Sequence, residues 1–166
     1  MSFVSFGNFK TQLGIVYSNH ASSLFEKDFW VVKKEFRYCI DGDSNKLVIV
    51  PRGFLTDGAT VPRLFWGLIP PWGRYGQAVV LHDYLCEFLG YWESGQWVTI
   101  TRKDADRIFD QAMADLGVGS TLRRTMYMAV SFYTQLSKFK SNSFHQRKRI
   151  LEKEMNLVYD QTGLWI

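Results

Sequence analysis

Three residues in the middle of the chain, His82, Asp83 and Asp106, are of the types that carry acid–base chemistry. His82 lies in the segment GQAVVLHDYLCEFLG and Asp106 in TRKDADRIFDQAMADLG, and the apolar spacing of both segments predicts amphipathic helices. Both side chains fall on faces that also carry apolar residues. Burying either one without a partner would cost roughly 1–3 kcal/mol. We therefore predict that His82 and Asp106 bond each other across two packed helices.

This pair has two interpretations, and the residues alone leave both open. In one, His82 and Asp106 are a structural contact that holds two helices in register. In the other, Asp106 orients His82 as the general base of an enzyme. Asp83 lies about 100° further around the helix, so it points to the flank. There it could bind Ca2+ or Mg2+ with loop carbonyls, or it could be an exposed acid or a salt-bridge partner of Arg63 or Arg74.

The string TDGATVPR forms a second group of polar residues. Asp57 and Arg63 could pair and close this loop, or Asp57 could serve as an acid while Arg63 binds an anion. The surrounding segment, residues 53–76, has the glycines and prolines of a loop but is unusually apolar. We predict that it packs against the His82 helix and that Asp57, Arg63, Trp66 and Trp72 form the wall of a pocket there.

Several classes of site are excluded by motifs that the sequence lacks. There is no zinc-binding spacing, no Gly-x-Ser-x-Gly nucleophile elbow and no glycine-rich phosphate loop. The formal charge of +4 and the pI of about 9.1 are only mildly basic, and no nucleic-acid motif accompanies them. We therefore expect no sequence-specific nucleic-acid partner.

Composition predicts a globular protein made in a cytoplasm. The chain has 166 residues, 46% hydrophobic and 16% aromatic, which is enough for one domain with a core. Cys39 and Cys86 imply no disulfide framework, so a reducing compartment is expected. No apolar run approaches the roughly 18 residues of a membrane span, and the start lacks the pattern of a secretory signal.

Strand signals dominate the first third of the sequence. Residues 29–55 are rich in aromatic and β-branched residues, and the turn sequence DGDSN predicts a hairpin across residues 41–45. A further strand is expected within residues 14–17. Pro51 should mark a strand edge or a bulge, because proline cannot donate to the ladder.

Helix signals dominate from residue 77 onward. Thr101 and Asp104 predict a capping box, Gly117 a helix end, and Ser120 the cap of the following helix. A last helix is expected over residues 143–158, and its basic run is predicted to be a solvated face.

The predicted fold is α+β. A short antiparallel sheet from the N-terminal third should be followed by the apolar loop and then by three or four helices. We expect a single domain over residues 1–166, β-rich over about residues 1–55 and helical over residues 77–158.

Four strings in this order and spacing, KLVIVPRGFLTDGATVPRLFW, AVVLHDYLC, ADRIFDQAMADLGV and RRTMYMAV, resemble the bacteriophage domain family of unknown function numbered 1353. The resemblance runs from about residue 46 to residue 130. It implies a protein of phage or prophage origin and leaves the activity open.

The order Ala-x-x-x-His-Asp followed by Ala-Asp-x-x-Phe also resembles the helical core of secreted and parvovirus-capsid A-two phospholipases. That resemblance implies His82 as the base that activates a water, Asp106 as its orienting carboxylate and Asp83 as a calcium ligand.

Two functional hypotheses follow. The first is a non-enzymatic phage accessory or virion protein that binds a phage structural protein or a host factor, in the host cytoplasm or in the virion after assembly. The second is a hydrolase that uses the His82–Asp106 pair on an ester of lipid or cell envelope, with Ca2+ or Mg2+ as its possible cofactor.

Overall fold

The computed structural model describes residues 8–58, 73–136 and 142–166, without the side chains of residues 133–136 and 142. The strands are β1 (Ile15–Tyr17), β2 (Trp30–Val32), β3 (Phe36–Cys39), β4 (Lys46–Val50), β5 (Leu55–Thr56), β6 (Gly90–Glu93) and β7 (Gln96–Thr99). The helices are α1 (Asn19–Phe25), the short 3-10 turn η1 (Ile40–Gly42), α2 (Gly76–Phe88), α3 (Arg102–Asp115), α4 (Ser120–Leu136) and α5 (Asn142–Thr162).

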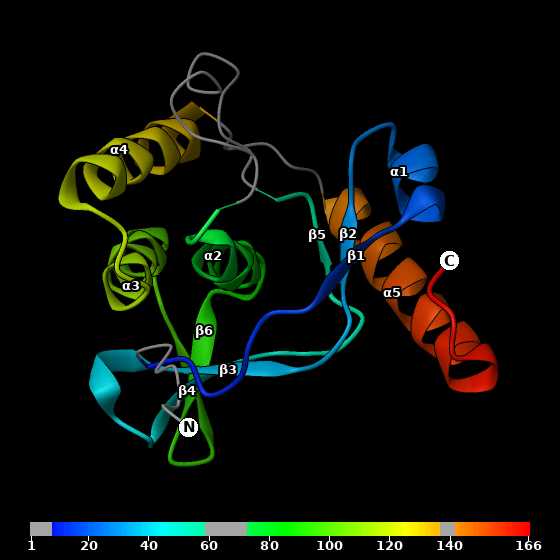
Figure 1. The fold of residues 1–166 in the computed structure, drawn as a ribbon, viewed down its shortest axis with the longest axis horizontal. Helices are drawn as coiled ribbons and strands as arrows, with labels where there is room; N and C mark the ends of the chain where they lie inside the picture. Colours follow the sequence, from blue (N-terminus) through cyan, green and yellow to red (C-terminus); the bar gives the residue numbers. More distant parts are fainter. Residues whose placement is uncertain (1–7, 59–72, 137–141) are drawn as a thin grey trace.

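The described strands form two antiparallel sheets, one in the order β1-β2-β5 and the other in the order β3-β4-β6-β7. Figure 1 shows α2 near the middle of the molecule, with α3 and α4 on one side and α5 with the first sheet on the other. Helix α2 packs on α3, and α3 packs on α4. The α+β fold is therefore as predicted, but there are two sheets rather than one.

The β6–β7 hairpin lies in the half of the chain that was predicted to be helical. Its turn residues Ser94 and Gly95 both have positive φ, 48° and 82°, which is the requirement of a tight hairpin turn that follows the strand twist. Gly90 is required nearby, because a Cβ there would lie 2.4 Å from the indole ring of Trp97. Trp97 pairs across the strands with Trp92, so aromatic packing favours the hairpin over a continued helix.

Other local predictions are confirmed. Strands β3 and β4 form the expected hairpin around residues 41–45, and β1 lies within residues 14–17. Thr101 and Asp104 form the predicted capping box of α3, and Gly117 follows that helix with a φ of 70°. Helix α1 was not predicted, although the Ser18 side chain caps it by accepting a hydrogen bond from the Ala21 amide.

The β1-β2-β5 sheet separates two apolar clusters. On β2, Val32 belongs to the larger cluster, which contains α2 and α3, while its neighbour Val31 belongs to the smaller one with α5. The same alternation occurs next to β2, where Phe54 belongs to the larger cluster and Leu55 to the smaller one. Since successive residues of a strand face opposite sides, this sheet is covered on both faces, and α5 covers one of them.

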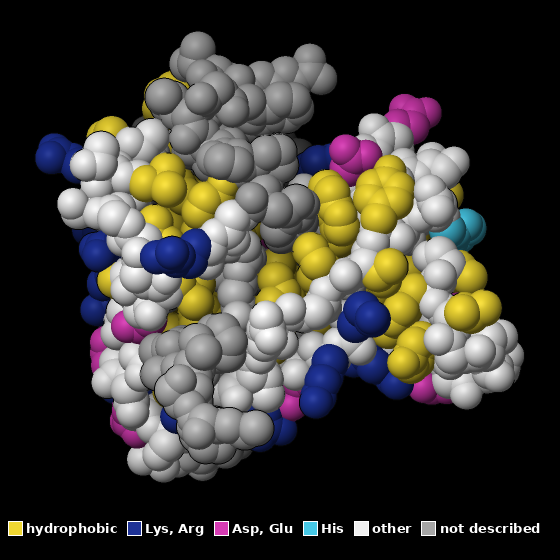
Figure 2. Space-filling model, in the orientation of Figure 1, with side chains coloured by type: hydrophobic (Ala, Val, Ile, Leu, Met, Phe, Trp, Pro, Cys, Tyr) yellow, Lys and Arg dark blue, Asp and Glu magenta, His cyan; other side chains and the backbone are white. Residues whose placement is uncertain are grey.

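Figure 2 shows apolar side chains gathered over the central part of the face drawn, while lysine and arginine side chains are distributed over several places. Among the helices of the described residues, none is both long enough and apolar enough to cross a membrane.

Candidate functional site

His82 and Asp106 meet where α2 packs on α3. The Nε2 atom of His82 lies 2.7 Å from Oδ1 of Asp106, and the two residues are only 8% and 4% exposed. The predicted bond between the two helices is thus present. Among the residues that the structure describes, no oxygen or nitrogen bonds Nδ1 of His82. In the described part of the chain, Nδ1 is therefore the ring nitrogen with a position left for a further ligand, since its contact there is with the Cys86 sulfur at 3.8 Å.

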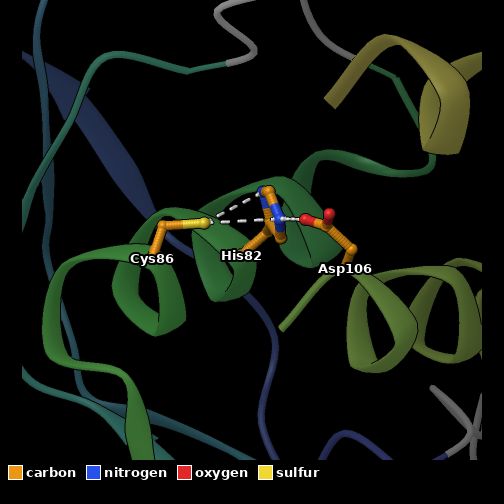
Figure 3. Close-up of side chains that lie close together, drawn as sticks. All are labelled: His82, Cys86 and Asp106. Atoms are coloured by element: carbon orange, nitrogen blue, oxygen red, sulfur yellow. Dashed lines mark hydrogen bonds and ion pairs between the residues drawn. The ribbon is translucent and has the colours of Figure 1, made fainter. Parts of the chain in front are cut away.

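Cys86 lies one helical turn after His82 and contacts its ring. Its Sγ atom is 3.4 Å from Nε2 and 3.8 Å from Nδ1, and Figure 3 shows the ring between the sulfur and the Asp106 carboxylate. A sulfur nearly equidistant from both nitrogens cannot lie in the ring plane, because it would collide with the carbon between them. The thiol therefore packs over the face of the ring. The Phe109 ring packs against it as well, with the two ring centroids 4.7 Å apart.

The group formed by His82, Cys86 and Asp106 has ligand atoms within 4.8 Å of one another, but its arrangement does not fit a metal ion. A metal binds an imidazole nitrogen along its lone pair in the ring plane. Here Nε2 is occupied by Asp106, and the sulfur lies over the ring face. Calcium and magnesium also prefer oxygen ligands to a thiolate. The geometry is that of a hydrogen-bonded pair with a thiol packed against it.

The surroundings of His82 favour its protonated form. Burial alone would lower the pKa of His82, but the Cys86 sulfur and the Asp106 carboxylate act in the opposite direction and raise it above its ordinary value. The neutral imidazole that could accept a proton therefore becomes more populated as the pH rises.

A second group of polar side chains lies on the flank of α2 at Asp83. Thr56 donates a hydrogen bond from Oγ1 to Oδ2 of Asp83 over 2.5 Å, and the Gly58 amide donates to the same Thr56 oxygen. Burial, and then the nearby Asp57 carboxylate, raise the pKa of Asp83 to about 7. Lys27 forms an ion pair with Asp57. Two carboxylates with unlike environments therefore lie beside the His82–Asp106 pair.

Three predicted pocket residues, Arg63, Trp66 and Trp72, lie outside the described residues, as does most of the predicted apolar loop. Their predicted roles remain predictions, and so does the pairing of Asp57 with Arg63. The start of that segment differs from the expected loop, because Leu55–Thr56 forms strand β5.

The burial of Lys148 on α5 has no signal in the sequence. The basic run of the last helix was predicted to be solvated, yet Lys148 is only 5% exposed. Its Nζ lies 2.5 Å from Oε2 of Glu87 on α2 and 3.6 Å from Oε1 of Glu152, over the ring of Phe54. Glu87 is distant in sequence, so no local pattern could reveal it.

The fold and the site define an α+β protein with a buried histidine–aspartate pair on two packed helices and a carboxylate group beside it. The chain belongs to the DUF1353 family, described as proteins of unknown function, because the family matches residues 30–130. The predicted family is thereby confirmed. The matched segment contains His82, Asp83 and Asp106 and ends before α5.

Among curated proteins, the chain is similar to the uncharacterized protein y4jT of Sinorhizobium fredii (strain NBRC 101917 / NGR234). The two are 37% identical over 86 residues, which are 51% of this chain and 23% of y4jT. The matched part is thus less than a quarter of that longer relative. No solved structure is significantly similar to the chain.

Proposed function

We propose that the protein is a hydrolase in which His82 activates a water molecule and Asp106 orients His82. The observation that carries this proposal is the 2.7 Å contact of Nε2 with Asp106, which leaves Nδ1 for a water. If the protein had only a structural contact between two helices, that contact would account for the His82–Asp106 pair and for nothing else. It does not explain the carboxyl group of Asp83, the next residue of α2, whose pKa is raised to about 7, and groups with perturbed pKa values gather at functional sites.

The chemistry follows that of a general base. The water gives its proton to Nδ1 as its oxygen attacks the carbonyl carbon of an ester, and the imidazolium returns that proton to the leaving alcohol. The Asp106 carboxylate stabilises the charged ring through its contact with Nε2. The substrate class, an ester of lipid or cell envelope, rests on the resemblance of the His-Asp order to the phospholipase core.

A divalent cation is a separate part of the proposal. Asp83, Asp57 and Thr56 present the oxygen ligands that Ca2+ and Mg2+ prefer, and Asp83 would supply the first ligand. Lys27 already brings a positive charge to Asp57, so charge balance alone does not require a cation there. Added calcium or magnesium, with a chelator as the control, distinguishes a cation-assisted reaction from one that uses the histidine alone.

Activity on chromogenic short-chain esters and on phospholipid vesicles tests the proposal. His82→Ala should lower the rate by about 10²–10⁴-fold, because the base is removed. The matched control is His20→Ala, since His20 is an exposed histidine on α1 and should leave the rate unchanged. The rate should also increase with pH, because the raised pKa of His82 keeps the ring protonated at low pH. Equal rates for wild type and His82→Ala would contradict the proposal.

The second candidate is a non-enzymatic phage protein that binds a phage structural protein or a host factor. The observation that favours it is that both carboxylate oxygens of Asp106 are already hydrogen bonded in a buried position. On this alternative, no ester is hydrolysed with or without metal. His82→Ala and Asp106→Asn would then change only stability or assembly.

A further inference from the structure

Asp106 has a second hydrogen-bond partner, and it comes from a third helix. While Oδ1 of Asp106 bonds His82, Oδ2 accepts a hydrogen bond from Oγ of Ser131 over 3.2 Å. Ser131 belongs to α4, which packs on α3. The carboxylate is thus held at both oxygens, by one side chain from α2 and one from α4.

Two anchored oxygens fix the plane of a carboxylate, which a single hydrogen bond cannot do. With only the His82 contact, the Asp106 carboxylate could turn about its Cβ–Cγ bond, and the imidazole would follow it. Asp106 is 4% exposed, so water does not readily replace a missing donor at Oδ2. The hydroxyl of Ser131 both fixes the plane of the carboxylate and supplies the donor at Oδ2.

We propose that Ser131 is a positioning residue, which fixes the Asp106 carboxylate and through it the direction in which Nδ1 of His82 faces the reacting water. This inference rests on the proposed hydrolase function. Ser131 itself touches neither the water nor the substrate in this mechanism. It acts only through Asp106, as a donor that keeps the orienting carboxylate in one geometry.

Three variants on α4 test this role. Ser131→Ala removes the donor, and Ser131→Thr keeps the hydroxyl. The matched control is Thr125→Ala on the same helix, because Thr125 also has a bonded hydroxyl, which donates to the Thr121 carbonyl and not to the site. Should Ser131→Ala fail to fold, Ser131→Cys replaces it, since a thiol is a weaker donor of similar size.

The first readout is the kinetics of ester hydrolysis. Ser131→Ala should lower kcat roughly tenfold at unchanged KM, the loss expected for one hydrogen bond to a charged group. Ser131→Thr should restore most of that rate, and Thr125→Ala should match wild type.

The second readout does not depend on turnover. In proton NMR, the His82 Nε2–H that bonds Asp106 should give a downfield signal, identified by its absence in His82→Ala. Ser131→Ala should broaden this signal and speed its exchange with water, while Thr125→Ala should not.

The outcomes separate the two proposals. If wild type hydrolyses nothing, the hydrolase function is overturned, and the imidazole signal still tests whether Ser131 fixes the pair. If Ser131→Ala keeps both the wild-type kcat and the wild-type signal, or if Thr125→Ala changes them equally, the positioning role of Ser131 is overturned.

Discussion

At the scale of single residues, the free energy of the His82–Asp106 contact depends on what is left behind when one partner is removed. Asp106→Ala would leave a buried imidazole without its hydrogen-bond partner. We therefore expect the free energy of unfolding to fall by roughly 1–3 kcal/mol, measured by urea denaturation. The matched control is Asp110→Ala on the same helix, because Asp110 pairs with Arg123 at a partly exposed site and should cost roughly 1 kcal/mol or less. Equal losses for the two variants would contradict this expectation.

Partly buried ionisable groups also make mildly acidic pH the condition in which the folded state is more stable. Burial and the Asp57 carboxylate raise the pKa of Asp83 from 3.8 to about 7, and burial raises the pKa of Glu152 from 4.5 to about 6. Between the unfolded and folded values the folded state binds more protons, so stability falls as pH rises through this window. The raised pKa of His82 also makes the folded state less stable as the pH rises. The stability that protonated His82 contributes is fully present below the ordinary pKa of histidine and is lost at higher pH.

The urea midpoint should therefore be higher near pH 5 than near pH 8, by an amount that Asp83→Asn reduces. The amide of that variant keeps the shape of the side chain but cannot ionise. Asp41→Asn is the control, since Asp41 is exposed and asparagine tolerates its φ of 54°. A midpoint that rises with pH from 5 to 8 would show that Asp83 and Glu152 do not titrate as described.

The contact of His82 with Asp106 could be predicted because each residue shares a helix face with apolar residues. The partners of Asp83 could not be predicted in the same way. Thr56 ends β5 and Asp57 follows it directly, and only the position of this segment beside α2 decides which atoms meet. The bond from Ser131 to Asp106 could not be predicted either, because a serine in an amphipathic helix does not indicate which carboxylate it contacts.

At the scale of elements, α5 is joined to α2 by the buried Lys148. Lys148→Ala would leave the Glu87 carboxylate, whose side chain is 4% exposed, without its closest cation. Arg149 and His145 remain 3.5 and 3.9 Å from Glu87, so we expect a loss of roughly 1.5–3 kcal/mol in the free energy of unfolding, measured by urea denaturation. The control is Lys153→Ala, an exposed lysine on the same helix.

A double-variant cycle then separates this ion pair from general packing. Lys148→Met combined with Glu87→Gln should be less destabilised than Lys148→Met alone, because the buried Glu87 carboxylate is then no longer charged. If Lys148→Ala and Lys153→Ala lower the free energy of unfolding by the same amount, Lys148 does not join the two helices.

Elements with strong local signals were predicted well, and those held by distant contacts were not. The Thr101 capping box consists of residues within one stretch of four, so the start of α3 could be predicted from the sequence. The β6–β7 hairpin has a local signal in Ser94 and Gly95, which the apolar pattern around it obscured. Its pairing with β4 depends on residues far apart in the chain and has no such signal.

At the scale of the whole molecule, the β1-β2-β5 sheet makes the two apolar clusters dependent on each other. Removal of residues 137–166 deletes α5 and with it Leu151 and Met155 of the smaller cluster. The face of the sheet that carries Val31 and Leu55 would then be exposed. We expect this shortened chain to bind a hydrophobic dye and to lose the sharp urea transition of the full chain. A shortened chain with the full-length urea midpoint would contradict the prediction.

The α+β class of the molecule could be predicted, because strand and helix signals occupy different parts of the sequence. The division into two sheets could not. Whether neighbouring strands join one sheet or two depends on the bend at Lys33 and Lys34, between β2 and β3, where no turn motif stands out.

The indole rings of Trp92 and Trp97 have an optical consequence. Their centroids are 5.3 Å apart and their planes are inclined by 72°, so the two chromophores share their excited states. Coupled chromophores in a fixed chiral arrangement give a circular dichroism couplet that each indole alone would not give. Both belong to the β6–β7 hairpin, which directly follows α2. The protein thus carries its own light-absorbing reporter of order at the end of the His82 helix, readable without any attached dye.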